Sequence, residues 1–245
     1  MSALPGTTGR RRIYLMRHGH VDYFAPEVRE RGTTDFVSLT ALGREQALAS
    51  GVALSHIRFD RALSSGLPRT RQTAEIVLSE NRDTGHLTLG TEPGLVEIKG
   101  GKNFPKVKTR EEFAARMAFE FDQAGEPGAR MMGGDAFAEV QERAVAALKR
   151  LLAEPGWHTA LVVAHEGTNR LLLSWMTGAG LKAVQAFEQD LACINVFDFD
   201  MVPREDSSVG TEIQRRFIKS VNLTPYNYVK HGMNLTALET IFTRV

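Results

Sequence analysis

The sequence is poor in features that would place it outside the cell or in a membrane. Of its 245 residues one is a cysteine, Cys193, so an intrachain disulfide is excluded and stability has to come from packing. No apolar run approaches the roughly 18–20 residues of a membrane span, and residues 13–16 are too short an apolar piece for a signal peptide. These absences favour a soluble cytoplasmic protein with no membrane partner.

An excess of one charge is also missing. The chain has 30 Lys and Arg residues against 29 Asp and Glu residues, and this balance argues against a nucleic-acid partner. Internal repeats and low-complexity blocks are lacking too. Hydrophobic residues at 42% and charged residues at 24% are ordinary globular values, which excludes a disordered chain or a disulfide scaffold. We expect a single domain over residues 1–245.

Short apolar runs alternate with helical patterns along the chain. Strands are predicted at residues 12–16, 62–64, 87–91, 160–164, 194–199 and 213–221, and helices at 41–55, 68–80, 137–152 and 168–177. Thr40 suits an N-cap, Pro68 a first helical position and Gly178 a helix stop. The alternation predicts an α/β three-layer sandwich, with a mainly parallel central sheet flanked by helices.

Residues 98–134 interrupt this alternation. The segment is rich in Gly and Lys, and Thr109 to Glu112 fits a capping box, so a helix is expected from about Glu111. Four glycines and a proline at residues 125–134 would end that helix. We interpret the segment as an insertion or cap over the active-site end of the sheet.

Four basic side chains follow the predicted strands. Arg17 and His18 come after the first strand, His165 after residues 160–164, and Arg69 at the start of the helix after residues 62–64. Ligands bind beyond the carboxyl ends of strands in such sheets. Guanidinium groups bind anionic oxygens, and a neutral imidazole can attack phosphorus. The pattern therefore predicts a phosphoryl site.

The motifs around these residues resemble a known family. Residues 15–19 (Leu-Met-Arg-His-Gly) are similar to the Arg-His-Gly signature of the histidine phosphatase superfamily, in its phosphoglycerate mutase-like branch. Residues 39–47, 65–74 and 162–170 resemble three further family segments in the same order, and residues 133–135 resemble the family's Gly-Gly-Glu-Ser with Asp for Glu. The likeness spans about residues 13–176.

The resemblance implies a role for each matching residue. His18 would be the nucleophile that forms a phosphohistidine, while Arg17, Arg69 and His165 would hold the phosphoryl oxygens. Glu97 occupies the place of the family's proton donor. The reaction implied is metal-independent hydrolysis of a small phosphorylated metabolite without a cofactor.

Other carboxyl and imidazole groups leave alternatives open. Glu92 and Asp22 are rivals of Glu97 as proton donor. His20 forms a His-x-His with His18, which invites a metal reading, although spacing places no third ligand. Glu166 stands where the family often has a small residue, as either a substrate contact or an exposed charge. A buried, inert thiol is expected at Cys193.

Two departures from the family pattern bear on the substrate. Phe24 stands where many members have an Asn, so one phosphate contact is missing or replaced. The basic, tyrosine-bearing insertion of true phosphoglycerate mutases is not seen, which favours a phosphatase over a mutase-type phosphotransferase. A non-catalytic phospho-ligand binder is the third alternative. The loop after Glu97 carries four lysines, which are either solvated or attract acidic substrates to the site: Lys99, Lys102, Lys106 and Lys108. The sequence does not identify the natural substrate, and it leaves open whether the protein forms a homodimer.

Overall fold

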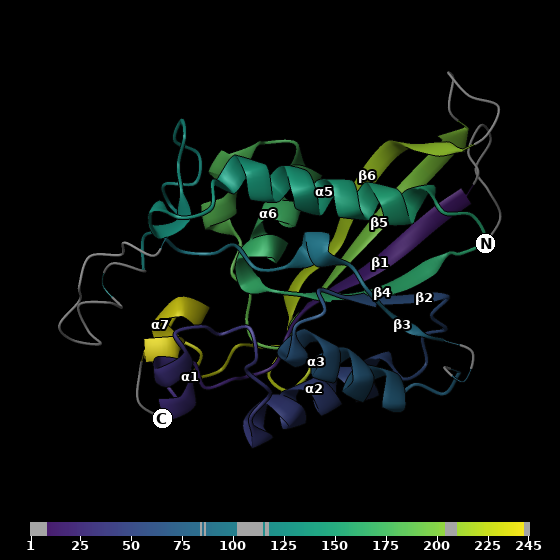
Figure 1. Cartoon of the computed structure of the whole chain (residues 1–245). Coiled ribbons are helices and arrows are strands. Elements are labelled where there is room, and N and C mark those ends of the chain that lie inside the picture. The colour runs from purple at the N-terminus through teal and green to yellow at the C-terminus, as the bar shows by residue number, and fades with distance from the viewer. Residues whose placement is uncertain are drawn as a thin grey trace.

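The computed structural model describes residues 9–83, 85, 87–101, 115, 118–203 and 210–242. Within these residues the strands form a six-stranded sheet in the order β3-β2-β4-β1-β5-β6 (Figure 1). The strands are β1 (Gly9–Arg17), β2 (Arg61–Ser64), β3 (Leu89–Thr91), β4 (Thr159–Ala164), β5 (Ile194–Pro203) and β6 (Thr211–Leu223). β1 to β4 pair in parallel, whereas β5 and β6 join the β1 side of the sheet antiparallel. The predicted fold class, a mainly parallel sheet between helices, is confirmed.

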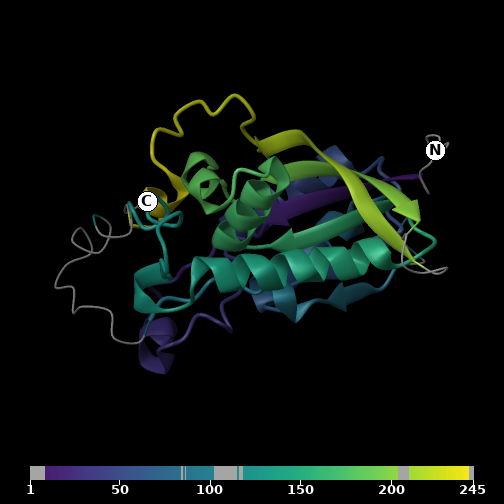
Figure 2. The same ribbon diagram turned by 90° about the horizontal axis from the view of Figure 1, so that it is seen from above.

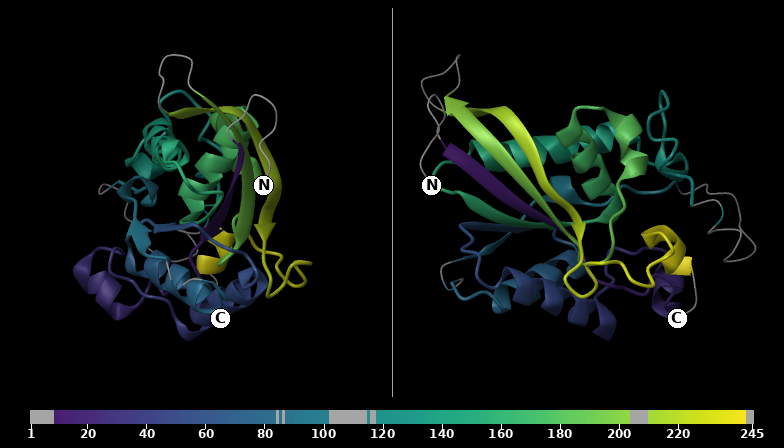
Figure 3. Two further views of the ribbon diagram at one scale, coloured as in Figure 1. Left: turned by 90° about the vertical axis from the view of Figure 1, so that its right-hand side faces the viewer. Right: turned by 180° about the vertical axis from the view of Figure 1, so that it is seen from behind.

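Helices cover both faces of this sheet (Figures 1 and 3). The α-helices in the described part are α1 (Pro26–Arg31), α2 (Ala41–Leu54), α3 (Pro68–Ser79), α5 (Phe137–Ala153), α6 (Glu166–Thr177) and α7 (Ala237–Phe242). The described residues also include the 3-10 turns η1 (Pro93–Leu95), η2 (Met131–Gly133) and η3 (Leu181–Ala186). The short helices α1 and α7 were not predicted. Both lie at the end of the molecule where the parallel strands finish.

The side chains of the central strands divide between two cores. Ile13 and Leu15 of β1 pack with α5 and α6 on one face, and α5 runs along the length of the sheet (Figure 2). Tyr14 and Met16 pack with α2 and α3 on the other face. β4 alternates in the same way. A strand buried on both faces reads as a continuous apolar run, which is why these two strands were predictable.

Two Arg–Asp pairs fix the register of β1 against β5. Arg10 lies opposite Asp200 and Arg12 opposite Asp198, with Nε to Oδ1 distances of 2.8 and 2.7 Å. Both carboxylates are buried, so the pairs satisfy charges that would otherwise be costly. They also explain why the strand starts at Gly9, three residues before the predicted start.

Part of the predicted insertion can be located. Residues 102–114 and 116–117, including the helix expected from Glu111, lie outside the described residues. Phe121, Ala124 and Met131 pack against α5, α6 and Leu238 of α7 in a separate apolar cluster. In the described part of the chain, no helix is long and apolar enough to cross a membrane.

Candidate active site

The ends of three neighbouring strands bring the predicted basic residues together. Arg17 lies opposite Ala164 in the β1–β4 register, so His18 and His165 leave the sheet side by side. Their ring centroids are 5.3 Å apart. β2 pairs with the other side of β4 and delivers Ser65 to the same place. Residues 147 positions apart in the sequence thus share one site, as the parallel topology predicted.

His18 is held with one ring nitrogen bound and the other turned to the site. Its Nδ1 lies 2.8 Å from the carbonyl oxygen of Gly19. Because a carbonyl can only accept, Nδ1 carries the proton and Nε2 keeps its lone pair. The Tyr23 hydroxyl lies 3.3 Å from Nε2. Burial lowers the pKa of His18 well below its ordinary value, and the cations Arg69 and Arg17 lower it further. A neutral imidazole of this kind can act as a nucleophile.

His165 is oriented by a hydroxyl chain from α3 and the turn before it. Its Nε2 lies 2.8 Å from Ser65 Oγ, which in turn lies 2.9 Å from Thr70 Oγ1. Burial lowers the pKa of His165 well below its ordinary value, with Arg69 adding to the effect. The hydroxyl contact fixes the ring and leaves Nδ1 available to a ligand.

Arg17 and Arg69 each use only some of their N–H groups to bind the protein. Arg17 donates from Nη1 to the carbonyl oxygen of Gln189 at 2.5 Å, and its Nη2 lies 3.1 Å from Glu166 Oε2. Arg69, the second residue of α3, donates from Nη1 to the carbonyl oxygen of Thr34 at 2.9 Å. Among the described residues, Nε of each arginine and Nδ1 of His165 are buried without a hydrogen-bond partner. Buried donors are normally paired, so the two arginine Nε groups fit a ligand with acceptor oxygens, which His165 can also bind in the tautomer that protonates Nδ1.

Glu97 approaches the same site from the loop after η1. Its Oε1 accepts the N–H groups of Ile98 and Thr168, both at 3.0 Å, and its Oε2 accepts that of Gly167 at 3.2 Å. Burial raises the pKa of the Glu97 carboxyl; these N–H groups lower it, and the charge of Glu166 raises it. A Cβ at Gly167 would lie 2.9 Å from Glu97 Oε1. Only glycine lets the carboxyl sit so close to the start of α6.

The rival residues have other partners. Glu92 accepts the N–H of Gly94 and pairs with Arg150 at 2.9 Å, and Asp22 caps the N–H of Phe24 in an exposed turn. These contacts assign both carboxylates to local structure.

The remaining residues that the sequence left open are also placed. His20 Nδ1 lies 2.8 Å from Thr40 Oγ1, and the described residues hold no group of three side chains suited to a metal ion. Burial raises the pKa of the Cys193 thiol to about 12, as expected of an inert cysteine. Lys99 pairs with Asp35 at 3.2 Å, and the other three lysines lie outside the described residues.

A cavity of about 550 Å³ opens over this cluster. Arg17, Arg69, Glu97 and Glu166 line it, together with Tyr23. Its outer wall is largely apolar, formed by Val28, Leu67, Ile98, Phe121, Met131 and Leu238. Tyr23 was not predicted as a pocket residue, whereas Glu166 was left open as a substrate contact or an exposed charge. Tyr23 stands in the atypical run after the Arg-His-Gly motif, and that departure was the available signal.

Parallel strands that present two histidines and two arginines at one edge define a phosphoglycerate mutase-like α/β protein. Residues 13–203 match the model of the histidine phosphatase superfamily (branch 1), and the chain belongs to this superfamily.

Its relatives include phosphatases and mutase-like enzymes. The 2-carboxy-D-arabinitol-1-phosphatase of Triticum aestivum is 29% identical over 207 residues, which are 82% of this chain and 39% of that protein. The chain thus spans about two fifths of the length of this plant phosphatase. The probable phosphoglycerate mutase GpmB of Proteus mirabilis is 29% identical over 195 residues, 78% of this chain and 86% of that protein.

Solved structures share the fold. The mycobacterial glucosyl-3-phosphoglycerate phosphatase superposes with a TM-score of 0.65 at 23% identity, covering 87% of this chain and 99% of that one. The alpha-ribazole phosphatase from Shigella flexneri gives a TM-score of 0.60 at 22% identity, covering 86% and 96%. At such identities the comparison establishes the fold alone.

Proposed function

We propose that this protein hydrolyses phosphomonoesters through a phosphohistidine intermediate. His18 Nε2 attacks phosphorus while Glu97 gives its proton to the leaving oxygen, which departs as an alcohol. A water molecule then attacks the phosphohistidine, and the Glu97 carboxylate takes its proton. Inorganic phosphate leaves and His18 returns to its neutral form. No step in this proposal uses a metal ion, so activity should survive a chelator.

The arrangement of His18 carries the proposal. Its Nδ1 proton is bound by Gly19, its pKa is lowered by burial and by Arg69 and Arg17, and the buried Nε groups of these two arginines have no hydrogen-bond partner in the described chain. The phosphoryl group would take the place of the Tyr23 hydroxyl next to Nε2. Arg17, Arg69 and His165 would then bind its oxygens. Fixed charge of this kind supplies much of the acceleration that phosphate-ester hydrolysis needs.

The segment 98–134 is assigned the role of a substrate wall in this proposal. Its described residues Ile98, Phe121, Met131 and Met132 line the pocket. In this proposal they contact the leaving group of the bound phosphomonoester.

The test is replacement of the nucleophile. H18A should lose turnover of phenyl phosphate and should form no acid-labile phosphoenzyme after rapid quenching of a labelled substrate. Exposed His56 gives the matched control, because H56A keeps every residue of the site. Activity of H18A at the wild-type level would overturn the proposal.

The mutase alternative predicts a different product. With 3-phosphoglycerate and a trace of 2,3-bisphosphoglycerate, a mutase exchanges isomers without releasing free phosphate. We expect phosphate release, even if slow with this compound, and isomer exchange alone would replace our proposal. A binder without catalysis would bind phosphate and give no phosphoenzyme.

A further inference from the structure

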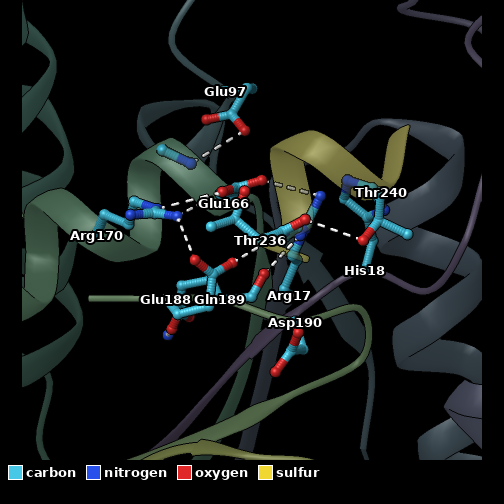
Figure 4. A network of polar contacts seen from close by, with 12 residues as sticks. Arg17, His18, Glu97, Glu166, Arg170, Glu188, Gln189, Asp190, Thr236 and Thr240 are labelled. Atoms are coloured by element: carbon cyan, nitrogen blue, oxygen red, sulfur yellow. Dashed lines mark hydrogen bonds and ion pairs between the residues drawn. The ribbon is translucent and has the colours of Figure 1, made fainter. Parts of the chain in front are cut away.

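Glu166 is a buried carboxylate inside the pocket, directly after His165 in the chain. It is the first residue of α6 and only 3% exposed, so its expected alternative as an exposed charge is wrong. Its Oε2 lies 3.1 Å from Arg17 Nη2 and its Oε1 lies 2.9 Å from Arg170 Nη2 (Figure 4). A negative charge therefore stands beside the arginine assigned to the phosphoryl group.

The contacts of Arg170 hold this carboxylate at the pocket wall. The Arg170 guanidinium lies 3.1 Å from Glu188 Oε2 and 4.4 Å from the centre of the Phe121 ring. Glu188 Oε1 in turn accepts the N–H of Ala237 at 2.8 Å. Since both oxygens of Glu166 are bound and Arg170 is fixed from behind, the carboxylate has little freedom to turn away from a substrate.

Apart from Arg17 and Arg69, the described residues of the pocket wall offer little positive charge to a second anionic group on the substrate. Arg17 and Arg69 point at the phosphoryl site, and the lining residues of the outer wall are mainly apolar. Lys99 also lines the pocket, but its ammonium group pairs with Asp35 at 3.2 Å. A carboxylate or second phosphate on the substrate would thus meet the carboxylates Glu166 and Asp35, uncharged residues such as Thr33 and Thr34, or apolar surface. Like charges in a partly dehydrated pocket repel more strongly than in water.

We propose that Glu166 is a specificity-determining residue that rejects phosphomonoesters carrying a second anionic group next to the phosphate. The favoured substrates have an uncharged or cationic leaving group with apolar surface. This inference rests on the proposed phosphatase activity and names its substrate class.

Two matched substrates test the inference. Glycerol phosphate and 3-phosphoglycerate of the same configuration differ in one group, a hydroxymethyl in the first and a carboxylate in the second. The wild type should show a kcat/KM at least tenfold higher for glycerol phosphate. E166Q should raise the ratio of kcat/KM for 3-phosphoglycerate to kcat/KM for glycerol phosphate about tenfold or more. This ratio does not depend on how much of the variant is folded.

E188Q is the matched control. It removes a carboxylate bound to the same Arg170 and absent from the pocket lining, so the substrate ratio should stay at the wild-type value. An unchanged ratio in E166Q, or an equal change in E188Q, overturns the inference while the phosphatase proposal stands. If the wild type turned over no phosphomonoester, the proposed function would fail instead. In that case calorimetry would measure the binding affinity of wild type, E166Q and E188Q for the same two compounds. A larger affinity ratio of 3-phosphoglycerate to glycerol phosphate in E166Q alone would support the inference, and an unchanged ratio would overturn it.

Discussion

Glu97 and Glu166 are two carboxyl groups in one pocket with opposite surroundings. Glu166 faces the guanidinium groups of Arg17 and Arg170. Glu97 accepts backbone N–H groups and lies within reach of the Thr168 hydroxyl at 3.4 Å. Burial raises the pKa of Glu97, and the charge of Glu166 raises it too. In the proposed mechanism Glu97 is the proton donor, and Glu166 stays paired with its two arginines.

Replacing Glu97 should matter most for substrates with a poor leaving group. E97Q should lower kcat/KM for an alkyl phosphate by about 10²–10⁴, the usual contribution of general acid catalysis. With 4-nitrophenyl phosphate, kcat/KM should change far less, because nitrophenolate leaves without a proton. The phosphohistidine should then accumulate, since its hydrolysis needs the Glu97 carboxylate, and rapid mixing should show a burst of nitrophenolate.

The rival carboxylate provides the control for this experiment. E92Q changes a group that binds Gly94 and Arg150, and it should leave both substrates at the wild-type rate. Equal losses for the two substrates in E97Q would exclude proton donation by Glu97.

At the residue scale, motif and topology together pointed to one group of residues. That Arg17, His18, Arg69 and His165 would lie close together was predictable, because each stands at or shortly after the end of a parallel strand and such strands end at one edge of the sheet. The ion pairs of Glu166 were not, because a buried carboxylate depends on partners such as Arg170, whose orientation is set by tertiary packing. The hydroxyl contact of Ser65 to His165 depends on the same packing.

At the element scale, the turn after β1 packs against the start of α2 at a close contact between the backbones of Gly19, His20 and Gly43. A Cβ at Gly43 would lie 2.2 Å from the carbonyl oxygen of His20, and one at Gly19 would lie 2.3 Å from that of Gly43. The Thr40 cap, whose Oγ1 accepts the Gly43 N–H at 3.1 Å, starts the helix at this contact. The close approach fixes the turn that carries His18.

G43A should therefore disturb both stability and activity. The added methyl group has to displace backbone, and overpacking of this kind costs about 1–3 kcal/mol of unfolding free energy. The turnover number should fall as well, because the turn after β1 moves. L42A is the control: Leu42 precedes Gly43 in α2 and is 44% exposed, so urea unfolding should detect little change. Wild-type stability and turnover in G43A would show that the contact is dispensable.

Elements with a strong local signal were predicted well. The Thr40 cap, Pro68 at the start of α3 and Gly178 after α6 are all found where expected. The direction of β5 and β6 could not be predicted, because an apolar run carries no information on whether its neighbour is parallel. Helices α1 and α7 have six residues each, too short for an apolar periodicity to show.

At the scale of the whole molecule, a net charge of +1 conceals a site where positive charge is concentrated. Arg17 and Arg69 stand around two buried neutral histidines, so protonating either histidine in the folded state is unfavourable. The unfolded chain has no such restraint, and its histidines take up protons below a pH of about 6.5. The folded protein should therefore lose stability as the pH falls below that value.

His165 allows this loss to be measured. Its pKa is lowered in the folded state, so its contribution to stability is complete above about pH 6.5 and declines on acidification, by at most about 1.4 kcal/mol for each pH unit. H165N removes the titrating group, and the difference in unfolding free energy between wild type and H165N should shrink from pH 6.5 to pH 5. The raised pKa of Glu97 makes the folded protein more stable on acidification. This effect is present in both proteins and largely cancels in the difference between their unfolding free energies. H56N makes the same substitution at an exposed histidine outside the site and is the matched control. Urea unfolding at half-unit steps of pH measures how the unfolding free energy of each protein varies with pH. If H165N showed the same pH dependence as the wild type, His165 would be as easily protonated in the folded protein as in the unfolded chain.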